Sequence, residues 1–240
     1  MCGIVGGVTE RNVVPILVEG LKRLEYRGYD SAGIAFQEQK KITLIKSLGR
    51  VKDLENKLKK DTSSNAGIAH TRWATHGIPS EKNAHPHTSN KNIYVVHNGI
   101  IENYEGLKSE LQSEGFKFYS QTDSEVIGHL VEFYKQRGLD FDSSVMKAVS
   151  RLKGAYALAV MDKNDPDTLI GVRQSSPLVV GEGFDENFLA SDIMALSPVT
   201  NKFKFLDDGQ VAFVTKNKIS ISSKEDRKST RLNSSHLVIS

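Results

Sequence analysis

The chain has 240 residues, of which 38% are hydrophobic and 25% are charged, and its formal net charge is +3. This length and composition are typical of a globular protein with one large domain or two small ones. Its single cysteine, Cys2, excludes an internal disulfide and fits a reducing cytosol, so we expect a cytoplasmic protein. No run of about 18 apolar residues occurs, and the amino terminus lacks a basic stretch followed by an apolar core, so we expect neither a membrane span nor a signal peptide.

The net charge does not indicate a nucleic-acid partner. Residues 224–240 hold four Lys or Arg and two Asp or Glu, so they supply +2 of the +3. No basic stripe with interleaved aromatic side chains occurs elsewhere, so we expect no nucleic-acid and no membrane partner. The same residues show no turn pattern, and we expect a non-native or disordered tail over 224–240 behind a domain over 2–223.

The first half of the chain begins and ends with strand patterns and contains one long loop. A buried strand is expected over Gly3–Val8, and Asn12 and Pro15 begin a helix whose Val14, Leu17, Leu21 and Leu24 share one face. The expected elements that follow are strands at Ala32–Gln37 and Ile42–Ser47, a helix at Asp53–Lys60, a strand from Ala66–Ala69, a loop over Thr71–Asn92 and a strand at Ile93–Val96 with Asn98-Gly99 at its tip. Because loops of this length inside a domain are usually functional or disordered, the loop is a candidate site.

Helices and then short strands make up the second half. Helices are expected over Asn103–Glu114, from a capping box at Thr122–Glu125 and over Asp142–Leu152. The expected strands are Ala155–Met161, Thr168–Val172, Leu178–Val180, Phe188–Ala190 and Gln210–Thr215, with turns at Asp165–Asp167, Asp207–Gly209 and Lys216-Asn217 and a short helix over Ile193–Leu196. Since helices and strands do not alternate regularly, the pattern favours an α+β fold in which helices cover two packed antiparallel sheets.

Cys2 is a candidate nucleophile because removal of Met1 would place its thiol and a free α-amine on one carbon. An α-amine titrates at about 7.7–8.0 and a thiol at about 8.5, so the amine can accept the thiol proton near neutral pH. The alternative is that a cysteine at the second position has no function.

Four further residues have both a functional and a structural interpretation. Asn98 and Gly99 can donate hydrogen bonds to an oxyanion, or they form a tight turn. Arg72, beside Trp73, can hold a carboxylate by a bidentate pair, or it is a surface residue. Asp123 can receive a substrate ammonium, or it only stabilises the first turn of a helix.

Five of the seven histidines lie between residues 70 and 97, so a zinc site has to be considered. Their spacing matches no HExxH signature, and no second cysteine is present. We therefore expect no metal and no other cofactor.

Five stretches together resemble one family, the class II glutamine amidotransferases, and within it the glutaminase domain of glucosamine-6-phosphate synthases. They are Cys2–Gly6, Arg23–Gly33, Ala69–Gly77, Asn83–His87 and Val96–Asn103. The similarity extends from Cys2 to about Ser222. It implies a four-layered αββα amino-terminal-nucleophile hydrolase fold, with two stacked antiparallel sheets between helical layers.

The resemblance also implies a role for each of nine residues. The implied catalytic residues are Cys2 as the nucleophile with its own α-amine as the base, Asn98 and Gly99 as the oxyanion hole, and Arg27 as a support for the nucleophile. The implied glutamine-binding residues are Arg72 for the α-carboxylate, Asp123 for the α-ammonium, Thr75 and His76 in the pocket wall, and Trp73 as a cover that gates ammonia.

In that family the ammonia converts fructose 6-phosphate to glucosamine 6-phosphate on sugar isomerase domains, which nothing after Lys224 resembles. We expect glutamine hydrolysis without amino-sugar synthesis, and a monomer where the full-length enzymes are homo-oligomers. Two alternatives remain open at this point. One is a stand-alone amino-terminal-nucleophile amidohydrolase, and the other is a catalytically silent fragment, which a retained Met1 would also produce.

Overall fold

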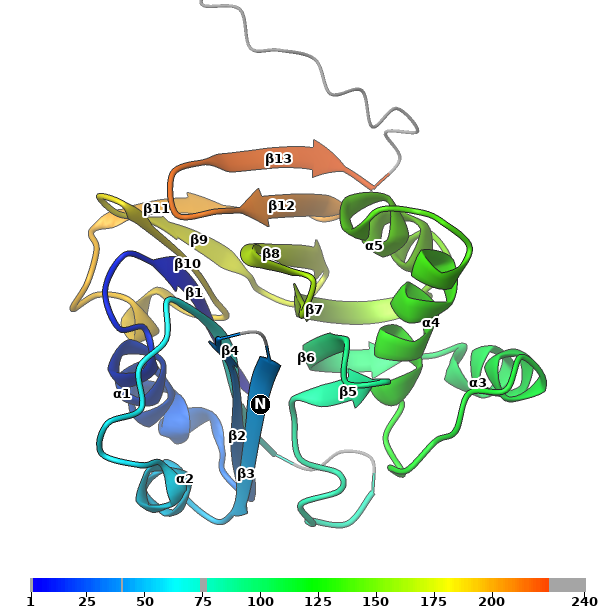
Figure 1. The fold of residues 1–240 in the computed structure, drawn as a ribbon, viewed down its shortest axis with the longest axis horizontal. Helices are drawn as coiled ribbons and strands as arrows, with labels where there is room; N and C mark the ends of the chain where they lie inside the picture. The colour runs from blue at the N-terminus through cyan, green and yellow to red at the C-terminus, as the bar shows by residue number, and fades with distance from the viewer. Residues whose placement is uncertain (1, 40, 74–76, 225–240) are drawn as a thin grey trace, which may run out of the picture.

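The computed structural model describes residues 2–39, 41–73 and 77–224. Two antiparallel sheets lie face to face, with helices on the outer face of each (Figure 1). This arrangement confirms the expected four-layered αββα fold. The expectations for Met1, Thr75, His76 and most of the tail fall on residues outside the described part of the chain.

Thirteen strands of the described residues form the two sheets. The seven-stranded sheet runs in the order β11 (Lys202–Phe205), β9 (Val179–Glu182), β10 (Glu186–Ala190), β1 (Gly3–Thr9), β4 (Ala66–Arg72), β2 (Ser31–Glu38) and β3 (Lys41–Leu48). The six-stranded sheet runs in the order β13 (Ile219–Ser223), β12 (Gln210–Val214), β8 (Asp165–Gln174), β7 (Gly154–Asp162), β6 (Ile93–Ile101) and β5 (His87–Ser89). β1 is thus a central strand, and it begins directly after Cys2.

Three hydrophobic clusters hold the layers together. The middle cluster lies between the sheets and contains Ile4, Ile68, Val96 and Leu189. The two outer clusters join α1 (Val14–Leu24) and α2 (Val51–Lys57) to the first sheet, and α3 (Tyr104–Ser113), α4 (Glu125–Gln136) and α5 (Phe141–Val149) to the second. Since each fully buried Leu or Ile contributes about 1.5–3 kcal/mol, burial on both faces of both sheets is the main source of stability.

α1 shows how the sequence pattern becomes structure. Its apolar residues recur every three or four positions, and Leu17, Leu21 and Leu24 are all fully buried. The Asn12 side chain accepts a hydrogen bond from the Val14 N–H at 3.1 Å, but the N-cap is Val13, so Asn12 lies one position before the capping place expected for it. The helix therefore holds the start of β1 from the outer side.

Three short strands were not expected from the sequence. β5 lies inside the predicted loop and pairs only with β6, while β11 and β13 are the outermost strands on their side of each sheet. Each has three to five residues, which is too short for its alternating pattern to stand out, and each depends on hydrogen bonds to one neighbouring strand.

Two predicted boundaries were wrong. The turn expected at Asp165–Asp167 lies earlier, at Lys163 and Asn164, and Asp165 already pairs with Asp162. α2 begins at Val51 and not at Asp53, because the Asp53 carboxylate accepts the backbone N–H of Arg50 at 2.9 Å and so closes the first turn from inside the helix.

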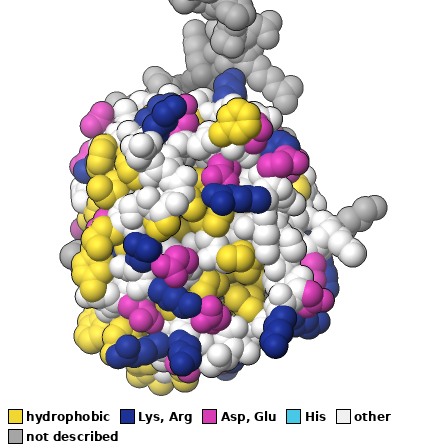
Figure 2. Space-filling model, turned by 90° about the vertical axis from the view of Figure 1, so that its left-hand side faces the viewer, with side chains coloured by type: hydrophobic (Ala, Val, Ile, Leu, Met, Phe, Trp, Pro, Cys, Tyr) yellow, Lys and Arg dark blue, Asp and Glu magenta, His cyan; other side chains and the backbone are white. Residues whose placement is uncertain are grey.

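The face at the left of Figure 1 mixes both signs of charge. Figure 2 shows Lys and Arg side chains interspersed with Asp and Glu on this face, with hydrophobic side chains among them. Ion pairs on the helices of the first sheet include Lys22–Glu55, between α1 and α2, and Glu19–Arg23, within α1. Among the described residues, no helix is long and apolar enough to cross a membrane.

Candidate active site

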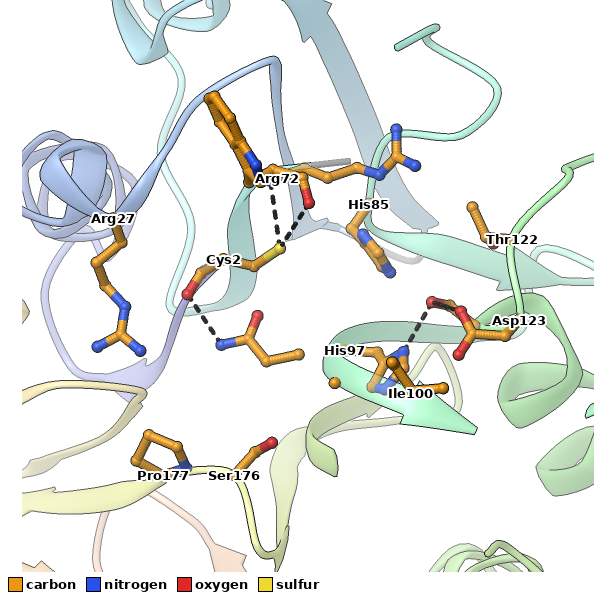
Figure 3. Close-up of a pocket in the computed structure, with 14 residues that line it drawn as sticks. Cys2, Arg27, Arg72, His85, His97, Ile100, Thr122, Asp123, Ser176 and Pro177 are labelled. Atoms are coloured by element: carbon orange, nitrogen blue, oxygen red, sulfur yellow. Dashed lines mark hydrogen bonds between the residues drawn. The ribbon is translucent and has the colours of Figure 1, made fainter. Parts of the chain in front are cut away.

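One cavity of about 290 Å³ gathers every described residue to which the sequence assigned a site role. Its walls come from the start of β1, the end of β4, the far half of β6 and the segment before α4 (Figure 3). The lining residues are Cys2, Arg27, Arg72, Trp73, His85, His97, Asn98, Gly99, Ile100, Thr122, Asp123, Ser124, Ser176 and Pro177. Thr75 and His76, the remaining two predicted site residues, lie outside the described residues.

The Cys2 thiol is half-buried at one wall of this cavity. The backbone N–H of Trp73 donates a hydrogen bond to Cys2 Sγ at 3.2 Å, and the thiol donates to the backbone carbonyl of Trp73 at 3.6 Å. Burial raises the pKa of the thiol, while the Trp73 hydrogen bond and the charge of Arg72 act in the opposite direction. A nucleophile at this position therefore needs a base close by.

The sequence predicted Asn98 and Gly99 at the tip of a strand, and this was wrong, because both lie inside β6 and do not form a tight turn. β6 continues to Ile101, with Asn98 opposite Ala157 and Gly99 opposite Tyr156 in β7. Gly99 nevertheless has a positive φ of 121°, and a Cβ there would lie 2.0 Å from the Ala155 carbonyl oxygen. The Asn98 amide donates to the Cys2 carbonyl at 3.2 Å, which joins the two sheets at the cavity.

Arg72 is the last residue of β4 and is only 3% exposed, so it is not a surface arginine. Its guanidinium lies 3.8 Å from the Asp30 carboxylate and donates to the Gly77 carbonyl at 3.2 Å. These contacts fix a cation at the cavity wall, where it can hold an anionic group.

Asp123 lies before α4 and does not occupy its first turn. The helix begins at Glu125, and one Asp123 carboxylate oxygen accepts the Ile101 N–H at 2.7 Å. Asp123 is 4% exposed and lines the cavity, so its charge faces the same space as Arg72.

The predicted capping box at Thr122 and Glu125 was wrong. The Thr122 hydroxyl instead lies 3.0 Å from His87 Nε2. The Glu125 carboxylate accepts hydrogen bonds from the backbone N–H groups of Tyr119 and Ser120 and from the Ser120 hydroxyl, at 2.7–3.1 Å. These bonds fold the segment before the helix back on itself and present Asp123 to the cavity.

Arg27 lies on the Cys2 side of the cavity (Figure 3), and Trp73 is hydrogen-bonded to Cys2. Arg27 is paired with Asp192 at 3.3 Å, and the Tyr26 hydroxyl donates to the same carboxylate at 2.8 Å. Trp73 is 54% exposed and packs against Gly28, where a Cβ would lie 2.9 Å from the indole ring. An exposed indole at the mouth of a cavity is suited to cover a bound molecule.

Four of the clustered histidines, His70, His85, His87 and His97, are buried side by side, and two of them, His85 and His97, line the cavity. The ring centroid of His85 lies 4.2 Å from that of His70 and 4.6 Å from that of His87. Burial lowers the pKa of His70 to about 3 and those of His85 and His87 well below the ordinary value, so all three are neutral. The residues that the structure describes contain no group of three or more His, Cys, Asp or Glu with the geometry of a metal site.

Sequence reasoning did not assign seven of the lining residues to the site. From the sequence, His85 and His97 are candidates only for a zinc site, and Thr122 only for a helix cap. No site role is assigned to Ile100, Ser124, Ser176 and Pro177, because their place in the wall depends on the packing of the two sheets.

Comparison with known proteins agrees with this geometry. Residues 70–198 match the family model of the glutamine amidotransferase domain. The chain is 53% identical over 222 residues to glutamine–fructose-6-phosphate aminotransferase [isomerizing] from Acinetobacter baylyi, covering 92% of this chain and 36% of that protein. It is 50% identical over 226 residues to the Escherichia coli protein of the same name, covering 93% of this chain and 37% of the relative.

A solved structure shares the fold. The glutamine phosphoribosylpyrophosphate amidotransferase from B. subtilis superposes with a TM-score of 0.81 at 25% identity, covering 94% of this chain and 50% of that one. The chain thus spans little more than a third of the length of the two aminotransferases above. Because the family model covers more than half of the chain and the fold agrees, the chain belongs to the glutamine amidotransferase domain family.

Proposed function

We propose that this chain hydrolyses the side-chain amide of L-glutamine to glutamate and ammonia, with the thiol of Cys2 as the nucleophile. The observation that carries the proposal is a single cavity that combines a thiol, an amide donor, a buried cation and a buried carboxylate. These four groups match the parts of glutamine. The thiol and the Asn98 amide suit the reacting carboxamide, and Arg72 and Asp123 suit the two charges of the amino-acid end.

In the proposed reaction, Cys2 Sγ attacks the side-chain carbonyl carbon of glutamine. With Met1 removed, the α-amine of Cys2 takes the thiol proton and later gives a proton to the leaving nitrogen, which departs as ammonia. The negative charge that develops on the carbonyl oxygen is stabilised by Asn98 and by the Gly99 N–H. Water then hydrolyses the γ-glutamyl thioester, which releases glutamate and restores the thiol.

Substrate binding uses both charges in the wall. Arg72 pairs with the α-carboxylate and Asp123 with the α-ammonium of glutamine, and each charged hydrogen bond contributes about 1.5–3 kcal/mol. Thr75 and His76 belong to the same proposed pocket. Trp73 closes over it, and Arg27 supports the nucleophile end through its pairing with Asp192.

The names of the relatives indicate where the ammonia goes. We propose that, in a protein with the additional length of these relatives, the ammonia aminates fructose 6-phosphate to give glucosamine 6-phosphate. We expect the 240-residue chain by itself to release ammonia from glutamine without forming glucosamine 6-phosphate. We also propose a cytoplasmic location, because the chain has one free cysteine and no internal disulfide to form.

Glutamate release from glutamine tests the proposal. The protein is first checked by intact mass for removal of Met1, and the wild type is compared with Cys2→Ser and Cys2→Ala. We expect measurable glutamate from the wild type and a decrease of at least about 10³-fold in both variants, because alanine has no nucleophile and a serine hydroxyl is a much weaker nucleophile than a thiol.

A folded wild type without Met1 that releases no glutamate would contradict the proposal. Equal release by the wild type and Cys2→Ala would contradict the role of Cys2 while leaving hydrolysis standing. Assaying glucosamine 6-phosphate in the same reactions, with fructose 6-phosphate added, tests the expected absence of synthesis.

A further inference from the structure

We propose that His70 is a positioning residue that holds the Asn98 amide in the orientation needed for an oxyanion hole. This inference rests on the proposed function. His70 lies in β4 of the first sheet, and Asn98 lies in β6 of the second. Its Nε2 is 3.0 Å from Asn98 Oδ1 and 3.0 Å from the His97 carbonyl oxygen. His70 does not line the cavity, so it acts on the substrate only through Asn98.

The carbonyl contact determines the position of the imidazole proton. A backbone carbonyl oxygen only accepts hydrogen bonds, so Nε2 of His70 must carry a hydrogen. That single N–H is shared between the His97 oxygen and Asn98 Oδ1. The hydrogen on Nε2 of His70 therefore follows from the geometry.

The tautomer in turn determines which way the Asn98 amide faces. With Oδ1 on the His70 N–H, Nδ2 donates to the Cys2 carbonyl at 3.2 Å. A flipped amide would place its NH₂ against the His70 N–H and its oxygen against the Cys2 carbonyl, which are two repulsive contacts in a buried site. One N–H of the amide is used by the Cys2 carbonyl, and the second N–H is left for the cavity that Asn98 lines.

The surroundings of His70 keep this arrangement in place. His70 is 1% exposed, and its ring packs against His85 at a centroid distance of 4.2 Å. Burial keeps the imidazole neutral, because it lowers the pKa of His70 to about 3. The hydrogen bond from Nε2 does not itself depend on this pKa, because the imidazolium form would also carry a hydrogen on Nε2.

Three substitutions separate positioning from general stability. His70→Leu removes the N–H, His70→Gln keeps an N–H donor of similar reach, and Leu54→Ala on α2 controls for destabilisation away from the cavity. For His70→Leu we expect kcat for glutamate release to fall roughly 10- to 100-fold, which is less than the roughly 10²- to 10³-fold loss on removing an oxyanion donor. His70→Gln should recover most of the activity, and Leu54→Ala should retain wild-type kcat in its folded fraction.

Two measurements should not change in His70→Leu. Alkylation of Cys2 by iodoacetamide needs a thiolate but no oxyanion hole, and inhibition by glutamate reports binding of the amino-acid end. We expect both to stay within about twofold of the wild type, because they do not use the transition-state interaction of Asn98. In an Asn98→Ala background, His70→Leu should have no further effect on kcat.

An unchanged kcat in His70→Leu, or a full additional loss in the Asn98→Ala background, would refute the positioning role. An inactive wild type would refute the proposed function and this inference with it. An active wild type whose kcat does not change in His70→Leu would refute only this inference, so the two failures are distinguishable. NMR of ¹⁵N-labelled histidine in the wild type gives a test that no folding defect can obscure. A neutral Nε2–H tautomer at His70 is expected, and an Nδ1–H tautomer would overturn the proposal.

Discussion

Gly99 meets a steric limit that no other residue type satisfies. Its φ of 121° is rarely adopted by residues with a side chain, and a Cβ would lie 2.0 Å from the Ala155 carbonyl oxygen and 2.8 Å from the Tyr156 Cα. Both contacts are with the backbone of β7, which cannot move without breaking the pairing of β6 and β7. The glycine thus allows a locally irregular backbone inside a continuous strand, at the wall of the cavity.

Replacing this glycine gives a prediction at the residue scale. Gly99→Ala should lower the free energy of unfolding by at least about 1–3 kcal/mol, the cost of a strained backbone residue, and should abolish most glutamate release. Urea unfolding and the glutamate assay measure the two effects. Gly106→Ala on α3 is the matched control, because nothing lies within 4 Å of its Cβ position, and it should be neutral or stabilising. Equal stability of the two variants would contradict the steric argument.

At the scale of single elements, the start of α4 is organised by a buried carboxylate. Glu125 is 4% exposed, and its carboxylate is bound by the backbone of Tyr119 and Ser120. Burial by itself would raise the pKa of Glu125, but the nearby His129, at 3.6 Å, and hydrogen bonds from Ser120 and the Tyr119 backbone outweigh it and lower this pKa to about 2. The ionised carboxylate therefore holds the segment that carries Asp123.

Neutralising this carboxylate gives the prediction at the element scale. Glu125→Gln should destabilise the fold by about 1.5–3 kcal/mol through weaker hydrogen bonds to the Tyr119–Ser120 segment. It should also raise KM for glutamine more than it lowers kcat, because it displaces Asp123 and leaves Cys2 and Asn98 in place. Thermal unfolding and steady-state kinetics give both quantities.

An exposed carboxylate provides the control for this change. Glu114 pairs with Arg137 at 3.0 Å with nearly half of its side chain exposed, so Glu114→Gln should change stability by less than about 1 kcal/mol. If Glu125→Gln behaves like Glu114→Gln in both stability and KM, Glu125 does not organise the segment.

At the scale of the whole molecule, the buried neutral histidines link stability to pH. Unfolded histidine titrates near 6.5, whereas the pKa of folded His70 is about 3 and those of His85 and His87 are also well below the ordinary value. Below pH 6.5 the unfolded chain therefore binds more protons than the folded chain. Stability is fully present above pH 6.5 and is lost as the pH falls.

Urea unfolding at pH 7.5, 6.5 and 5.5 measures this linkage. We expect little change between the two higher pH values, and below pH 6.5 a loss that approaches about 1.4 kcal/mol per pH unit for each neutral histidine. A constant free energy of unfolding down to pH 5.5 would contradict this prediction, because it would show that His70, His85 and His87 take up protons in the folded state.

How far the sequence predicts this molecule depends on the range of each interaction. α1 was predicted from the three- and four-residue spacing of Leu17, Leu21 and Leu24, which is a local signal. β11 and β13 were missed because an edge strand forms through its neighbour. The capping box at Thr122 failed for a similar reason, since its hydroxyl is used by His87, which is 35 residues away in the chain.

The sequence by itself determined the layered α+β fold, the unusual position of Cys2 and, through five matching stretches, the family. Only the tertiary structure decided how the site is assembled. Cys2 and Asn98 are 96 residues apart in the chain and come from different sheets, so their contact exists only because the two sheets pack face to face. The same packing places His70 behind Asn98 and buries it, which makes an ordinary histidine neutral and turns it toward the amide.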